Sequence, residues 1–510
     1  MDYEESLRKI VKGAGLSLIG TVIGIAFGYL SRLVVARFLD PSDYGLVSLG
    51  FGVFTIAATL SLLGLPQGVI RFVSFYKGKG DDEKIKGVII SALRIGIPSS
   101  SITSLIIFLG AEWISVNFFH EPNLTPILQI FALAIPFWMF AQIAIAVTIG
   151  FQDMRYDVYV TYIFQNVFRL TAILILLWLG YGVIGASIGW VIAIAGMPFL
   201  AFYFLEKKVF PLTKVKAEPV DKELFTFSYP LILAGIAGLI MGWTDTVMLG
   251  YFLGAKAVGI YNVALPTARL IRMPLSSFGI IFSPVISELY ARNKHNDLRR
   301  LYSVVTKWTL TITFPASLLL IIFSESAIRI MFGSEYVEGA LALSILTLGF
   351  LVISTIGLSG SVLHAFGRTK VIMNCTFIGA TSNVILNLFL IPLYGVSGAA
   401  IATAISLIVT QILLFLNAHK IGRVQPFRTT LLKPVFASLI AVAVVYGIAR
   451  SIGTSLISFI LLFPIFTGLY FFLLLVFRSF EEEDLAVMRF IDQKMGTRSD
   501  ILRDLIKRFL

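Results

Sequence analysis

Six ionisable side chains lie inside long apolar stretches of the sequence, where each charge needs a physical reason. They comprise five arginines and one aspartate: Arg32, Arg94, Arg169, Arg269, Arg272 and Asp245. A charge at membrane depth is energetically costly, so its presence there indicates a functional site. Guanidinium groups bind phosphate oxygens through paired hydrogen bonds. The excess of arginine therefore predicts a basic cleft for an anionic ligand, because a carrier of cations needs carboxylates instead.

The arginines differ in what their positions indicate. We expect Arg32, Arg269 and Arg272 to contact the substrate, and the three-residue spacing puts Arg269 and Arg272 on one helix face. Arg169 joins this substrate-binding set, with the alternative that it binds backbone carbonyls of a neighbouring span. Arg94 lies near one end of its apolar run, where snorkelling of the side chain toward the membrane surface explains it.

Asp245 is the single carboxylate of the set, and two interpretations of it stay open. In the first, its charge couples transport to an ion, Na⁺ or H⁺. In the second, it is a structural ion-pair partner of Arg32 or Arg269. An internal sequence offset of about 214 residues, described below, places Asp245 almost equivalent to Arg32.

The elements that must position these residues are membrane helices. The chain has 510 residues, of which 57% are hydrophobic and 14% charged, and its mean hydropathy is +0.89. Soluble domains carry roughly 25% charged residues, so this composition predicts an all-α polytopic membrane protein. A span needs about 20 mostly apolar residues. Fourteen such runs lie near 14–38, 44–68, 87–110, 125–150, 158–180, 183–205, 225–249, 258–286, 304–324, 339–363, 371–392, 396–418, 430–450 and 454–477.

The distribution of lysine and arginine predicts that both ends of the chain lie inside the cell. With that orientation, 32 of the 41 basic residues fall in inner segments, 4 in outer loops and 5 within spans. Such a bias is the signature of the positive-inside rule. The net charge of +12 therefore reflects topology, and we expect no nucleic-acid partner.

The sequence also repeats itself at an offset of 213–215 residues. Each match lies at the same place in its half, and the paired segments are 181–186 with 394–399, 38–45 with 252–259, and 150–152 with 365–367. Each half has six spans, an even number, so the halves share one orientation about an axis along the membrane normal. This predicts two six-helix repeats around a central cleft, followed by two C-terminal helices.

The predicted domain organisation follows from these spans. Its parts are a cytoplasmic N-terminal segment (1–12), an N-terminal six-helix bundle (13–206), a cytoplasmic linker (207–223), a C-terminal six-helix bundle (224–420), two additional transmembrane helices (421–478) and a cytoplasmic amphipathic tail (479–510).

Three segments of the chain resemble the polysaccharide flippases of the MOP exporter superfamily. The run 386–403, LNLFLIPLYGVSGAAIAT, looks like their signature stretch. The segment RFLDPSDYG at 37–45 resembles their first outer loop, and HAFGRTK at 364–370 resembles the turn after their tenth span. Fourteen spans are typical of the polysaccharide transporter and lipid II flippase branches. The resemblance implies a flippase, not an enzyme, that moves lipid-linked oligosaccharide on a polyprenyl carrier across the cytoplasmic membrane.

Several further expectations accompany this interpretation. The partners are the lipid-linked substrate, membrane lipid, a coupling ion (Na⁺ or H⁺) and other polysaccharide-assembly proteins. No Walker A motif and no metal-ligand spacing is present, so we expect neither cofactor nor metal. The alternative function is a cation-coupled multidrug or metabolite antiporter of the same fold. A multi-span glycosyltransferase is disfavoured because the predicted outer loops are short.

Overall fold

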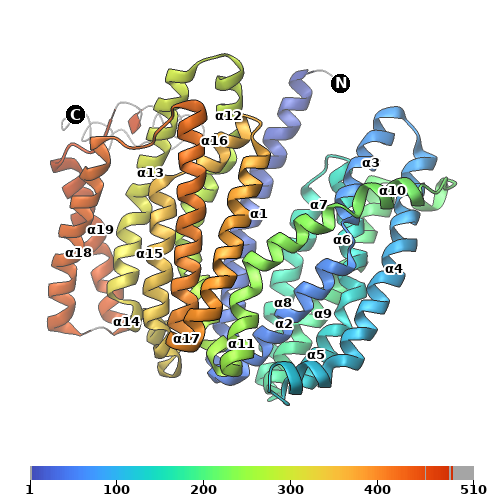
Figure 1. The fold of residues 1–510 in the computed structure, drawn as a ribbon, viewed down its shortest axis with the longest axis horizontal. Helices are drawn as coiled ribbons and strands as arrows, with labels where there is room; N and C mark the ends of the chain where they lie inside the picture. Colours follow the sequence, from blue (N-terminus) through green and yellow to red (C-terminus); the bar gives the residue numbers. More distant parts are fainter. Residues whose placement is uncertain (1–2, 454, 482–483, 486–510) are drawn as a thin grey trace. The chain divides into compact units, whose positions relative to one another are not determined.

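The computed structural model describes residues 3–453, 455–481 and 484–485. Throughout this part of the chain every regular element is a helix, which confirms the all-α class (Figure 1). The predicted amphipathic helix near the C-terminus, with its apolar face from Ile501 to Leu510, lies outside the described residues.

Twelve helices within the described residues are long and apolar enough to cross a membrane. Two of them, Gly242–Ala291 and Thr369–Gly422, contain 50 and 54 residues. One crossing needs about 20 residues, so each of the two is long enough for a pair of crossings. Each contains a glycine with non-helical backbone, Gly254 (φ 79°) in the first and Gly395 (φ 59°) in the second. The number of fourteen spans stays a prediction.

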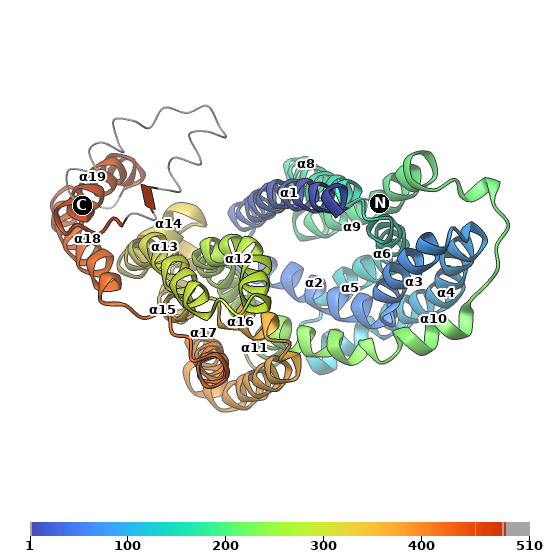
Figure 2. The same cartoon turned by 90° about the horizontal axis from the view of Figure 1, so that it is seen from above.

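The chain forms two compact units, and the first comprises residues 1–263 with 387–396. Within it α1 lies beside α8, and α9 lies beside both α6 and α8 (Figure 2). Its helices are α1 (Tyr3–Phe38), α2 (Pro41–Ser61), α3 (Leu65–Lys79), α4 (Asp82–Trp113), α5 (Leu124–Ala132), α6 (Ala134–Gly150), α7 (Arg155–Asp157), α8 (Gln165–Trp178), α9 (Gly182–Phe204), α10 (Asp221–Ser228) and most of α11 (Leu231–Arg269). Three π-helical segments, η1 (Ile114–Phe118), η2 (Val158–Phe164) and η3 (Leu205–Val209), extend α4, α8 and α9.

The second unit comprises residues 264–386 and 397–510, and in it α13 lies beside α15 and α18 (Figures 1 and 2). Its helices are α12 (Met273–Ala291), α13 (His295–Ile322), α14 (Ser324–Met331), α15 (Ala340–Ile356), α16 (Ser359–Ala365), the larger part of α17 (Thr369–Gly422), α18 (Leu432–Ile452) and α19 (Leu456–Val476). Each unit is a group of residues that mainly contact one another. The domain boundaries predicted from the sequence stay a prediction.

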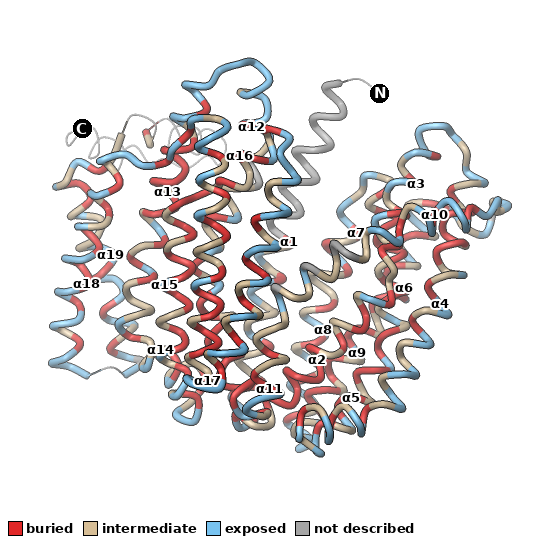
Figure 3. The backbone as a smooth tube through the Cα atoms, in the orientation of Figure 1, coloured by how far each residue is buried: buried red, intermediate tan, exposed pale blue. Residues whose placement is uncertain are grey.

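Large apolar side chains cover the outside of both units. Trp178 in the first unit is 81% exposed, and Ile457 in the second unit is 71% exposed. Buried positions line the inner faces of the helices in each unit, and exposed ones lie on the outer faces (Figure 3). An apolar exterior on this scale is unsuited to water. Together with the apolar length of the helices, it identifies a multi-pass membrane protein.

The backbone supports the internal repeat at positions matched by the sequence. Gly182 and Gly395 both have positive φ, 52° and 59°. Gln152 and Gly367 have φ of 64° and 69°, and each is the second residue after a helix, α6 and α16 respectively. Left-handed backbone is uncommon outside glycine, so its recurrence at an offset of 213–215 residues supports a duplicated fold.

A third matched pair, Gly45 and Gly259, forms a backbone contact within the first unit. A Cβ atom added to Gly45 would lie 1.7 Å from the carbonyl oxygen of Ala255. One added to Gly259 would lie 1.9 Å from the carbonyl oxygen of Pro41 and 3.1 Å from the backbone nitrogen of Gly45. Helices approach this closely only where side chains are absent. The start of α2 and the segment of α11 after Gly254 therefore cross at repeat-equivalent glycines.

The second unit buries a cation together with its counter-charges. Lys307 of α13 is 4% exposed, and its ammonium group lies 3.0 Å from Asp484 and 3.4 Å from Glu481. The indole N–H of Trp308 donates to the same Asp484 carboxylate. The segment after α19 thus neutralises a charge that would otherwise be costly to bury.

We predict that replacing Gly45 with alanine destabilises the protein, because the new methyl group meets backbone atoms that cannot rotate away. Overpacking of this kind costs about 1–3 kcal/mol of unfolding free energy. Thermal unfolding of the detergent-solubilised protein measures the change. Gly78→Ala is the matched control, because nothing lies within 4 Å of its added Cβ atom. An unchanged melting temperature for Gly45→Ala would contradict the close crossing.

Candidate functional site

Arg169 of α8 is a buried arginine whose guanidinium group is held from two sides. The residue is 6% exposed. Its Nη2 donates to the side-chain oxygen of Asn166 at 2.7 Å. Its guanidinium carbon lies 4.0 Å from the centre of the Trp190 ring on α9. Its Nε has no hydrogen-bond partner among the described residues. One donor of this fixed cation is therefore left unused in a buried position.

Asn166 is itself anchored by the π-helical segment that precedes α8. Its amide nitrogen donates to the carbonyl oxygens of Thr161 and Tyr162, each at 3.0 Å. π-helical turns occur often at functional sites. These two bonds orient the amide oxygen of Asn166 toward Arg169, which thereby gains a side-chain partner. The contact is compatible with both roles considered for Arg169, substrate contact and binding of backbone carbonyls.

A row of glycines on α1 brings this helix close to η2 and α8. A Cβ atom on Gly20 would lie 2.4 Å from the side chain of Val158, and one on Gly24 would lie 2.8 Å from that of Tyr162. The next glycine, Gly28, faces Nη2 of Arg169, which its added Cβ atom would approach to 3.3 Å. Small residues at four-residue spacing permit close packing of membrane helices. They also leave room for the guanidinium group.

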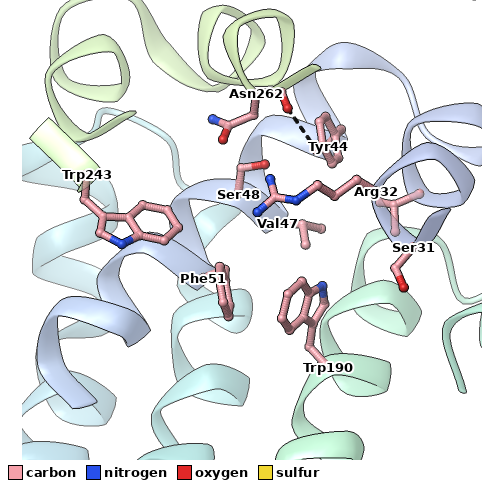
Figure 4. A pocket seen from close by; sticks show the side chains of 10 residues that line it. Ser31, Arg32, Tyr44, Val47, Ser48, Phe51, Trp190, Trp243 and Asn262 are labelled. Carbon is pink, nitrogen blue, oxygen red and sulfur yellow. Dashed lines mark hydrogen bonds between the residues drawn. The ribbon is translucent and has the colours of Figure 1, made fainter. Parts of the chain in front are cut away.

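Arg32 lies in a small pocket of the same unit (Figure 4). Its guanidinium group extends into the pocket between Ser48 and Phe51. The hydroxyl of Tyr44 donates to the carbonyl oxygen of Asn262 at 3.4 Å at the rim. The cavity measures about 20 Å³, room for about one water molecule. The pocket therefore has little free space around the arginine.

Aromatic rings connect Arg169 with the Arg32 pocket. Trp190 lines that pocket, and its ring centre lies 4.1 Å from that of Phe51. Phe51 in turn lies 5.6 Å from Trp243, edge to face. The sequence analysis did not single out these three aromatic residues, because aromatic side chains are common in apolar spans. Only the packing of α2, α9 and α11 reveals that they adjoin two arginines.

Arg32 and Arg169 bring two positive charges into one part of the first unit. The charge of Arg32 acts on the guanidinium group of Arg169. No carboxylate of the described residues forms an ion pair with either group. The structure therefore brings together two of the predicted substrate-binding residues and leaves their positive charge without a counter-charge.

Asp245 has two neutral hydrogen-bond donors. The hydroxyl of Tyr261 donates to one carboxylate oxygen at 2.6 Å, and the amide nitrogen of Asn387 donates to the other at 2.7 Å. Both donors belong to the same unit as Asp245. Arg32, one of the two ion-pair partners considered for Asp245, makes no ion pair with it. These contacts hold the carboxylate in place.

The other predicted arginines lie elsewhere. Arg269 ends α11 and Arg272 lies in the 3₁₀ segment η5 (Leu270–Arg272), both exposed in the second unit. Ser276, four residues after Arg272, is also exposed. Arg94 lies in the first unit, 60% exposed at its side chain and 3.6 Å from Asp221, which agrees with a snorkelling residue rather than a binding residue.

Comparison with known proteins places this geometry in a family. The model of the family described as polysaccharide biosynthesis protein matches residues 10–290, and that of the MatE family matches residues 230–389. An uncharacterized membrane protein of Methanocaldococcus jannaschii is 27% identical, over 79% of this chain and 82% of its own length. The probable low-salt glycan biosynthesis flippase Agl15 of Haloferax volcanii is 25% identical, over 89% of this chain and 92% of its own.

Solved structures agree on the fold. The lipid II flippase MurJ in an inward closed conformation superposes with a TM-score of 0.70 over 90% of this chain and 98% of its own, at 19% identity. The first family model covers more than half of the sequence, and the predicted resemblance is thereby confirmed. The chain belongs to the polysaccharide biosynthesis protein family.

Proposed function

We propose that this protein is a flippase that moves lipid-linked oligosaccharide across the cytoplasmic membrane by alternating access. The observation that carries the proposal is the pair Arg32 and Arg169, two guanidinium groups without a counter-charge in apolar helices. A substrate that joins sugar to polyprenol through phosphate or pyrophosphate brings the missing negative charge. Relatives named as glycan and lipid II flippases support the same substrate class.

This function requires the protein to bind the lipid-linked substrate and to reorient it across the membrane. Arginine donors hold the phosphate oxygens through charge-assisted hydrogen bonds, and the lipid tail stays in the bilayer. We place Arg269 and Arg272 with Arg32 and Arg169 as substrate contacts. No covalent bond of the substrate changes in this cycle, so no catalytic residue is assigned.

We place the protein in the cytoplasmic membrane with both termini inside, as the positive-inside bias of the loops supports. The substrate then enters from the side where sugar nucleotides are used and leaves on the outer side. Its partners in this scheme are membrane lipid and the polysaccharide-assembly proteins that make the substrate and consume it.

An antiporter that exchanges a drug or metabolite against a cation is the second candidate function. The MatE match over residues 230–389 favours it, and so does Asp245, a carboxylate that two hydrogen bonds hold within an apolar helix. In a flippase the same carboxylate has a role as the coupling site for Na⁺ or H⁺. The two functions differ in the charge of the cargo, and the pair Arg32 and Arg169 fits an anion better.

Replacing Arg32, Arg269 or Arg272 with alanine should slow flipping at least about tenfold. A hydrogen bond to a charged group contributes roughly 1.5–3 kcal/mol, and 1.4 kcal/mol is a factor of about ten. The measurement uses liposomes with a fluorescent polyprenyl-pyrophosphate sugar and an impermeant quencher. Arg94→Ala is the control, because its exposed ion pair with Asp221 is worth little. Flipping that survives all three changes would remove these residues from the site.

Asp245→Asn tests the coupling role. We expect flipping in the variant to ignore an imposed Na⁺ or H⁺ gradient, while flipping without a gradient continues, because the amide keeps an acceptor for Tyr261 but loses the charge. Liposomes with and without each gradient give the comparison. Tyr261→Phe is the matched control, since it removes a hydrogen bond and leaves the carboxylate charged. A variant that still responds to the gradient would show that Asp245 has a structural role.

A further inference from the structure

The chain turns sharply directly after α19, and the local backbone sets this turn. Arg478, the second residue after the helix, has a φ of 50°. Its N–H donates to the carbonyl oxygen of Leu475. Left-handed backbone with such a bond is a common way for a helix to end. We call the described residues from this point on, 478–481 and 484–485, the strap.

One carboxylate of the strap is held by several donors at once. Asp484 accepts from the ammonium group of Lys307 at 3.0 Å through one oxygen and from the indole N–H of Trp308 through the other. These two donors are neighbours on α13. The backbone N–H of Glu481 also donates to Asp484, at 2.7 Å. Adjacent donors that converge on both oxygens of a carboxylate hold it as they would hold an anionic ligand.

Lys307 belongs to the helix bundle, whereas its counter-charges belong to the strap. Its side chain is 5% exposed, and those of Asp484 and Glu481 are 12% and 24% exposed. Water therefore reaches this cluster from the side of the strap. Departure of the strap would leave the buried ammonium group without its two ion pairs, which is strongly unfavourable. Another anion must then take the place of the carboxylates.

We infer that Lys307 and Trp308 form an anion-binding pair on α13, and that the strap occupies this pair with Asp484 as an internal ligand. The external ligand is a phosphate group, which has the charge and the acceptor oxygens for an ammonium group and an indole N–H together. Lys307 lies three residues into the predicted span 304–324, near the end predicted to face the cytoplasm. Phosphate at that depth comes from a lipid headgroup or from a soluble ester. Neither residue of the pair is among the proposed substrate contacts.

The strap can leave α13 while α19 stays attached to it. The hydroxyl of Tyr470 on α19 donates to the carbonyl oxygen of Thr311 on α13 at 2.8 Å, and this contact does not involve the strap. The apolar side chains of the strap, Phe480 and Leu485, pack against α19 itself. The two carboxylates make its ion pairs with α13. Neutralising them therefore weakens the contact between the strap and α13 and leaves the helices packed.

Trypsin cleavage after Arg478 reports release of the strap. Arg478 is exposed, but Ser479 on the other side of the bond is 4% exposed, so cleavage requires local opening. Full-length protein in nanodiscs is digested, and mass spectrometry follows the fragment that ends at Arg478. Asp484→Asn should speed its formation at least about tenfold, because the hydrogen bonds to Asp484 lose their charge. Glu325→Gln, which removes an exposed ion pair with Arg329, is the matched control and should leave the rate unchanged.

Thermal unfolding tests the anion-binding pair. In the double variant Glu481→Gln/Asp484→Asn, sn-glycerol 3-phosphate in detergent or phosphatidylglycerol in nanodiscs should raise the melting temperature. Glycerol and phosphatidylcholine are the controls without net charge. Lys307→Met in the same background should abolish the rise. A rise with the soluble ester assigns the site to free phosphates, and a rise with the lipid alone assigns it to a headgroup.

Three results would overturn the inference. The first is cleavage of Asp484→Asn at the wild-type rate. The second is a double variant whose melting temperature neither phosphate raises, or whose rise survives Lys307→Met. The third is additive acceleration of cleavage by Lys307→Met and Asp484→Asn, since residues that act as one contact are coupled; this third test decides even where the double variant does not fold. Flipping enters none of these measurements, so the proposed function and the strap stand or fall separately.

Discussion

A positive charge buried in apolar helices without an internal counter-charge constrains everything that surrounds it. Arg169 meets that condition, and Arg32 beside it adds a second charge of the same sign. The glycine row of α1, the π-helical turn before α8 and the ring of Trp190 all shape the space around this pair. An anion bound here would supply the counter-charge that the buried guanidinium group lacks.

The duplicated fold supplies the scaffold on which such a site is built. Repeat-equivalent glycines, Gly45 and Gly259, cross at backbone distance where α2 meets the later part of α11. Close to that crossing lie Arg32, Asn262 and Tyr44 of the small pocket. The close backbone contact and the small size of the pocket therefore both result from the way in which these helices pack.

Much of this was predictable from sequence because it depends on strong, local signals. Apolar runs of about 20 residues predict membrane helices whatever their partners, and the repeat is visible in short turn motifs such as Tyr181-Gly182 and Tyr394-Gly395. The cost of a charge in lipid singled out Arg32 and Arg169. Which side chains surround them was not predictable. Trp190 looks like any lipid-facing aromatic residue until α8 and α9 are packed, and Asp245 gave no sign of its donors Tyr261 and Asn387.

The central claim is that the cargo is recognised through its phosphate. The most direct measurement compares flipping of two fluorescent lipids by the wild-type protein in the same liposomes. One is a polyprenyl-pyrophosphate sugar, and the other carries the same sugar on the same polyprenol without phosphate. We predict protein-dependent flipping of the first and none of the second. Equal flipping of both, or movement of a cationic dye with neither lipid, would contradict the account.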